Sequence, residues 1–289
     1  MMQHSDSEWA SLCHKVKGLL PEDIGKKAWY LVIFATLAVS PETSLPASFY
    51  TYLKENEPGF SSEASLDYLG QRFRDVLLKQ LSLVGGPQVL SVLIPLAKAE
   101  GDIESKAKFS SLNEKWFVSS VSSLSEYLSN GLSRRRADKM NVPAIYNRGL
   151  QTINTIYGEE LLNKIFNTWG SHKEDVKFNE VYTLYGLWLS DFEVLTPLET
   201  EAVVYSSISC LGLGGPGNWH LRGMGRLLGA KGKDDASEEM QKILQKLMNL
   251  KEAVVSVVHF VGQEFVNKAK LDKWADATSV SKDLGGWGN

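Results

Sequence analysis

LTPLETEAVVYSSISCLGLGGPGNWHLRGMGRLLGAKGKDDASEEMQKILQKL, residues 195–247, is the stretch that decides the fold. Thr196 precedes a proline and lies three residues before Glu199, which is typical of a helix N-terminus with a capping box. The mostly apolar run that follows ends in the glycine- and proline-rich residues 213–217, which we expect no helix to cross. A second helix is expected to begin with Asn218 as its N-cap and to end near Gly229, and a third to begin within residues 235–238.

The remainder of the chain has the same helical character. Apolar residues recur at helical spacing, and the expected helices cover residues 9–20, 23–39, 49–53, 66–81, 89–99, 106–130, 158–169 and 177–189. We find no run of alternating apolar and polar residues long enough to predict a strand. The sequence therefore predicts an all-α fold.

Composition excludes two classes of partner. The chain has 31 basic and 34 acidic residues and a formal net charge of −3, so it has no overall positive field to attract nucleic acid or anionic membranes. Its longest apolar run, residues 28–39, is shorter than the roughly 20 residues needed to span a bilayer. We expect neither nucleic acid binding nor a membrane span.

Cysteine usage and the N-terminal residues indicate the compartment. Cys13 and Cys210 are the only cysteines in the sequence, which excludes a disulfide framework and is typical of a reducing compartment. Two cysteines cannot build a structural zinc site alone, and we expect no metal. Residues 1–6 lack the features of a signal or transit peptide. The cytoplasm is expected, with a mitochondrial or peroxisomal matrix without a recognisable signal as the alternative.

Two parts of the chain look similar to each other. Residues 76–81 and 88–93 resemble residues 243–247 and 253–258, with a break between the segments of each pair. We predict two tandem pseudo-repeated helical units, namely a degenerate unit at 1–130 and a second unit at 143–275. A basic linker at 131–142 would join them, and residues 276–289 would form a flexible tail. The alternative is that any two amphipathic helix pairs look alike.

Several short pieces of the central stretch match a known pattern, namely Leu195-Thr196-Pro197, Glu199 and Glu201, Cys210-Leu211-Gly212, His220-Leu221-Arg222-Gly223 and Gly229-Ala230. On these pieces residues 196–250 resemble the carboxymuconolactone decarboxylase family, which shares its fold with the AhpD-like proteins. The resemblance is weak in the remainder of the chain. It implies an AhpD-like helical fold and assembly into a homo-oligomer.

The resemblance also implies a chemistry, from which this chain departs at one point. In AhpD-like peroxidases a glutamate and a histidine relay a proton to a Cys-x-x-Cys motif just before the histidine. Here residues 215–218 are Gly-Pro-Gly-Asn, and Cys210 has no second cysteine near it. Disulfide exchange needs both a nucleophilic and a resolving thiol, so a two-cysteine peroxidase is not expected. The decarboxylase branch uses no metal or organic cofactor, and we expect none.

An acid/base constellation remains. His220, in the first turn of its expected helix, would feel the positive end of the helix dipole, which favours the neutral imidazole that can accept a proton. Glu201 would orient the imidazole or act as the acid. Arg222 could hold a carboxylate through its guanidinium. Trp219 and Tyr205 could line the substrate pocket.

Each assignment has a structural alternative. His220 could be a capping or core histidine, and Glu201 could be favoured by the helix dipole alone. Arg222 could form an inter-helix ion pair, and Cys210 could be a small buried hydrophobic residue. Trp219 and Tyr205 could belong to the core.

Three functions follow from these alternatives. The leading prediction is a cofactor-free lyase or isomerase acting on a small carboxylated or carbonyl-bearing molecule. The second is a non-catalytic helical scaffold derived from the family, which suits a first unit that has no histidine in residues 68–74. The third is a single-cysteine thiol peroxidase, which requires Cys210 within hydrogen-bond reach of His220.

Overall fold

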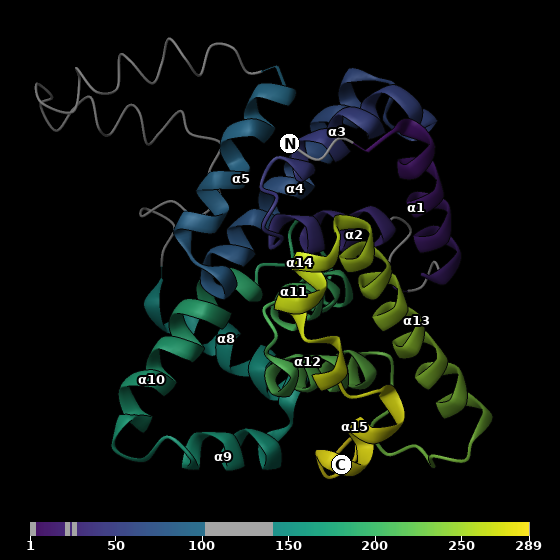
Figure 1. Ribbon diagram of the computed structural model, residues 1–289. Coiled ribbons are helices and arrows are strands. Elements are labelled where there is room, and N and C mark those ends of the chain that lie inside the picture. Colours follow the sequence, from purple (N-terminus) through teal and green to yellow (C-terminus); the bar gives the residue numbers. More distant parts are fainter. Residues whose placement is uncertain (1–3, 21–23, 25–27, 102–140, 289) are drawn as a thin grey trace, which may run out of the picture.

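The computed structural model describes residues 4–20, 24, 28–101 and 141–288, and these contain helices and no strand. The predicted all-α fold is confirmed. The helix expected at 106–130 and most of the basic linker at 131–142 lie outside the described residues. In chain order the main helices are α1 (Asp6–Leu19), α2 (Ala28–Ala38), α3 (Leu45–Asn56), α4 (Glu63–Val84), α5 (Gly86–Ala99), α8 (Val142–Tyr157), α9 (Glu159–Asn167), α10 (Lys173–Asn179), the π-helical segment η5 (Glu180–Leu189), α11 (Pro197–Cys210), α12 (Gly214–Leu227), α13 (Glu238–Val261), α14 (Gln263–Ala269) and α15 (Ala277–Asp283) (Figure 1).

Helix α11 lies at the centre of the molecule, and every residue from 199 to 210 is buried. It packs against α2, α4 and α12 (Figure 1). The predicted capping box is present, because the Thr196 side chain accepts from the Glu199 N–H at 3.2 Å and the Glu199 carboxylate accepts from the Thr196 N–H at 2.9 Å. These bonds satisfy N–H groups that the helix leaves without partners and fix where α11 begins.

Helix α11 also joins two groups of packed apolar side chains. The larger group draws on α1–α5 and on α11–α15, whereas the smaller one contains α8, α9, η5 and two residues of α11, Val204 and Ile208. The main core is therefore shared between the predicted units 1–130 and 143–275. The expected break between residues 247 and 253 is wrong, because α13 continues through it. The tandem repeat itself stays a prediction.

The segment after α14 is packed, and the prediction of a flexible tail is wrong for residues 276–288. Helix α15 buries Ala277 and Val280, and it packs against α12 and α13 (Figure 1). Trp287 is also buried, with its ring against Gly225 of α12. A Cβ atom at position 225 would overlap that ring, so the glycine makes room for the indole.

Helix α8 and η5 cross at a contact between two glycines. A Cβ atom on Gly149 of α8 would overlap the carbonyl oxygen of Val181 and lie 2.7 Å from the nitrogen of Gly186. A Cβ atom on Gly186 would lie 2.7 Å from the carbonyl oxygen of Ile145. The sequence predicted a helix over 177–189 but not its division into α10 and a π-helix, a rare geometry often found at functional sites.

A buried lysine fastens the end of η5 to α4. Lys79 has no exposed surface, and its ammonium group donates to the carbonyl oxygens of Trp188 at 3.2 Å and Asp191 at 2.7 Å. Asp75, one turn earlier in α4, forms an ion pair with it at 3.1 Å. Carbonyls at a helix C-terminus lack partners within the helix, and a cation satisfies them. Lys79 therefore fixes the position of the last turn of η5.

We predict that Gly149→Ala destabilises the protein by about 1–3 kcal/mol, because the added methyl group forces α8 away from η5. The control is Gly18→Ala in α1, where a Cβ atom meets nothing within 4 Å. That change should stabilise α1 by about 0.5–1 kcal/mol, since alanine favours helix over glycine. Urea unfolding measures both, and equal effects of the two substitutions would contradict the close crossing.

Lys79→Met should cost about 3–5 kcal/mol of unfolding free energy, because it leaves the Asp75 carboxylate and two carbonyl oxygens buried without their cation. Lys54→Met, at an exposed position of α3, should change it by less than about 0.5 kcal/mol. Thermal and urea unfolding of the two variants would be compared. A Lys79→Met protein as stable as the Lys54→Met protein would show that the lysine does not hold η5.

Candidate functional site

Helix α12 begins five residues earlier than expected. Its N-cap is Leu213, and the glycine and proline residues 214–217 form its first turn. The expected N-cap, Asn218, instead accepts a hydrogen bond from the Ala275 N–H at 3.1 Å through its side chain. Close packing explains Gly214 and Gly217, since a Cβ atom there would overlap the Lys273 carbonyl oxygen and the Ser209 hydroxyl respectively. His220 consequently lies in the second turn, where the helix dipole is weaker than predicted from the sequence.

Glu201 of α11 and His220 of α12 form a buried pair. The Glu201 Oε2 atom lies 2.9 Å from the His220 Nδ1 atom, and the two residues are 2% and 3% exposed. Gly223 allows this approach, because a Cβ atom there would overlap Ile156 and lie 3.3 Å from the Glu201 carboxylate. The structure therefore brings together the two residues expected to carry the acid/base chemistry.

Tyr157, at the end of α8, extends the pair on the other side of the imidazole. Its hydroxyl oxygen lies 3.1 Å from the Nε2 atom of His220. Burial raises the pKa of Tyr157 well above its usual value, so the phenol keeps its proton. We assign Nδ1–H as the donor to Glu201 and Nε2 as the acceptor from the Tyr157 O–H, an order that satisfies all three groups. The three side chains therefore form a hydrogen-bonded chain in the order Glu201 carboxylate, His220 imidazole and Tyr157 hydroxyl.

Helix η5 supplies the surroundings of this chain of hydrogen bonds. The ring of Tyr185 stands edge-on to the ring of Tyr157, with 6.3 Å between their centroids. Burial raises the pKa of Glu180, and a charge on His220 opposes that effect. Glu180, at the start of η5, therefore lies within electrostatic reach of His220, in addition to Glu201 of α11.

Of the other predicted site residues, the structure places some beside the Glu201–His220 pair and others away from it. Trp219 is half-buried and packs edge-on against Tyr157 at 6.3 Å between centroids. Tyr205 is buried in the main core, where it contacts the ring of Trp274. Arg222 donates from Nη1 to the backbone carbonyl of Tyr157 at 2.6 Å rather than to any group of His220. Trp219 therefore borders the hydrogen-bonded chain, whereas Tyr205 packs in the core.

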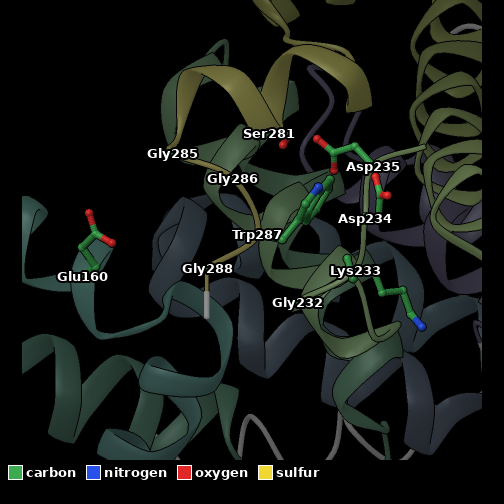
Figure 2. A pocket seen from close by; sticks show the side chains of 11 residues that line it. Glu160, Gly232, Lys233, Asp234, Asp235, Ser281, Gly285, Gly286, Trp287 and Gly288 are labelled. Atoms are coloured by element: carbon green, nitrogen blue, oxygen red, sulfur yellow. The ribbon is translucent and has the colours of Figure 1, made fainter. Parts of the chain in front are cut away.

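Two cavities lie beside the C-terminal segment, and one of them is lined by Tyr157. One, of about 410 Å³, is lined by Tyr157, Arg222, Arg226, the first turn of α9 and residues 284–288 in part. The other, of about 390 Å³, lies between residues 230–235 and the C-terminal segment. Figure 2 shows Trp287 beside Asp234 and Asp235 in the second cavity, with Glu160 set apart from them. Neither cavity is lined by Glu201 or His220, so Tyr157 is the link between the first cavity and the buried pair.

Cys210 does not meet the requirements of the single-cysteine peroxidase. Its side chain is 0% exposed, and burial raises the pKa of its thiol. Within the described part of the chain, no hydrogen bond joins it to His220. The geometry therefore gives this alternative no support. The described residues contain no group of three or more His, Cys, Asp or Glu side chains that could hold a metal ion.

Sequence reasoning missed four residues of this region: Tyr157, Glu180, Tyr185 and Arg226. Tyr157 lies 63 residues before His220 in the sequence, and no local motif marks either tyrosine. Arg226 lies one helical turn after Arg222, so their i, i+4 spacing could have suggested two guanidiniums on one face. Contacts between segments that are distant in the sequence could be identified only from the folded structure.

Comparisons of the chain with protein-family models, with curated proteins and with solved structures find no match. Membership of the carboxymuconolactone decarboxylase family therefore stays a prediction drawn from residues 196–250. Among the helices that the structure describes, none combines the length and the apolar character needed to cross a bilayer.

Neither thiol of the folded protein should react with Ellman's reagent at pH 8. Both cysteines are buried, and burial raises the pKa of Cys13 to about 12 and that of Cys210 further. Both should react after denaturation in guanidinium chloride. The Cys13→Ser and Cys210→Ser variants show which cysteine any observed reaction comes from. Fast reaction of Cys210 in the folded protein would support the single-cysteine peroxidase.

Proposed function

We propose that this chain is a cofactor-free lyase or isomerase that acts on a small carboxylated or carbonyl-bearing molecule. The observation that supports it is the continuous chain of hydrogen bonds from Glu201 through His220 to Tyr157, with distances of 2.9 and 3.1 Å. A buried carboxylate on one imidazole nitrogen holds the ring in one orientation and leaves the other nitrogen with a lone pair that can accept a proton.

His220 is the proposed base. When substrate takes the place of the Tyr157 hydroxyl at Nε2, the imidazole removes a proton from a carbon next to a carbonyl, and the C–H electron pair becomes an enolate. The imidazolium is stabilised by Glu201 and returns the proton to another carbon, which completes an isomerisation. In the lyase version His220 first takes a proton from water; carbon dioxide then leaves the substrate carboxylate, its former bond pair stays on carbon, and the imidazolium gives its proton to that carbon and returns to the neutral form.

The 410 Å³ cavity is the proposed entrance for substrate. Its volume suits a small organic molecule, and Tyr157 lines it while also covering the Nε2 atom of His220. Movement of the Tyr157 side chain would join the cavity to the imidazole. Arg222 lines the same cavity and is the proposed holder of a substrate carboxylate.

The alternative function, a non-catalytic helical scaffold, is favoured by the closed surroundings of the pair. Glu201 and His220 are buried and line neither cavity, whereas Leu90, Leu93 and Ile94 of α5 expose apolar surface. In that case the pair would serve stability, and exposed apolar side chains would contact another protein. A homo-oligomer and a cytoplasmic location remain part of either proposal.

Turnover distinguishes the two functions. The purified chain would be incubated with γ-carboxymuconolactone and with a panel of small β-keto and unsaturated carboxylic acids, and release of carbon dioxide and proton exchange would be followed. On any substrate found, His220→Gln should lower turnover by about 100-fold or more, because it removes the base. Tyr157→Phe tests whether the Tyr157 hydroxyl blocks access to the imidazole, since it removes the hydrogen bond to Nε2 of His220 and keeps the aromatic ring.

The matched control for that experiment is His259→Gln, at an exposed position of α13. It should leave turnover unchanged. Circular dichroism and thermal unfolding would verify that the His220→Gln protein is folded. Full activity in a folded His220→Gln protein would contradict the acid/base proposal. If the unsubstituted protein is inactive on every compound and His220→Gln lowers its stability, the scaffold function is favoured.

A further inference from the structure

Two arginines one turn apart on α12 meet over the C-terminal segment. Arg222 donates from Nε to the Gly286 carbonyl at 2.5 Å, and Arg226 donates from Nη1 to the Trp287 carbonyl. A Cβ atom built on Gly288 would lie 2.6 Å from Nη1 of Arg226 and 3.0 Å from Nη2 of Arg222. The two guanidiniums are therefore close neighbours at one point of the cavity wall.

Neither of these cations has an acidic partner among the residues that the structure describes. Their printed hydrogen bonds go to backbone carbonyls, which for Arg226 include that of Thr155 at 2.9 Å. Arg222 is only 3% exposed. Burial, and then the charge of Arg226, lower its pKa to about 10, and the Glu160 carboxylate offsets only part of that effect, so this pair of like charges is held at a cost. An anion between them would relieve it.

The start of α9 adds donors to the same wall. Gly158, its N-cap at φ 73°, offers no side-chain acceptor to the N–H groups of the first turn, and residues 158–161 line the 410 Å³ cavity. A Cβ atom on Gly158 would lie 3.2 Å from three atoms of the Arg226 guanidinium, so this glycine makes room for the arginine. Helix N-termini and paired guanidiniums both favour oxyanions.

Other charged side chains face this cavity as well. Glu159, Glu160 and Lys164 line it, and Glu160 and Lys164 are paired with each other at 2.6 Å. That pair is neutral as a whole, which leaves Arg222 and Arg226 facing one unpaired glutamate, Glu159. These five side chains carry a net charge of +1, and the α9 N-terminus adds partial positive charge to it, so the wall attracts an anion and attracts a doubly charged one more strongly.

We propose that Arg222, Arg226 and the N-terminus of α9 bind a doubly charged oxyanion group, a phosphate or a dicarboxylate, carried by a small molecule in the 410 Å³ cavity. As a statement about the substrate, this inference rests on the proposed function. Binding is measured without turnover, so the two can fail separately.

The test is calorimetric titration of the full chain at constant ionic strength with inorganic phosphate, with malonate and with acetate. We expect a dianion to bind at least about 10-fold more tightly than acetate, and Arg226→Gln to weaken it by about 10-fold or more. Arg226 is half-buried, so its loss is less damaging to folding than loss of Arg222. Tighter binding of phosphate than of malonate would indicate a phosphorylated ligand, and the reverse a dicarboxylate.

Three further variants make the result specific. Glu159→Gln should strengthen dianion binding, a gain that a general loss of structure would not produce. Arg74→Gln, an exposed arginine of α4, should leave it unchanged. His220→Gln should also leave it unchanged, which separates this site from the acid/base proposal. Absence of dianion binding up to about 10 mM, or equal binding by the Arg226→Gln protein, would overturn the inference.

Discussion

Two carboxylates on one fully buried helix are the constraint on which the rest of the structure depends. Glu199 and Glu201 are two residues apart in α11, so they point toward different neighbours, and each needs a partner because an unpaired charge in a core is strongly destabilising. Glu199 finds Arg72 of α4, and Glu201 finds His220 of α12. Replacing one partner would leave a buried charge behind, so α4 and α12 are both fixed against α11 by electrostatics as well as by apolar packing.

The position of Tyr157 depends on a series of close contacts between backbones. Gly149 lets η5 cross α8, and Lys79 holds the far end of η5 against α4. Gly223 then lets α12 approach the last turn of α8 beside Ile156. The phenol reaches the imidazole because α8 packs at short range against both η5 and α12. The hydrogen-bonded chain is thus a product of packing at glycines rather than of any local sequence motif.

Local signals in the sequence predicted much of this structure, and long-range contacts account for what they missed. The Thr196 capping box and the helical spacing of Leu69, Phe73 and Val76 are local, and they placed α11 and the buried face of α4 correctly. The nineteen-residue spacing of Glu201 and His220 became a contact because α12 folds back on α11. The start of α12 was misplaced, since glycines needed for close packing look like a helix break in isolation. Trp287 looked like part of a tail because Gly225, its docking position, is distant in the sequence.

The C-terminal segment has a consequence for how the molecule is assembled during translation. Residues 284–288 form part of the wall of both cavities, and the carbonyls of Gly286 and Trp287 hold the two arginine side chains in place. A ribosome makes these residues after every other part of either wall. The central helices can therefore pack while the arginine side chains still lack those two carbonyl acceptors, and a chain released before this point would have a core but an open cavity.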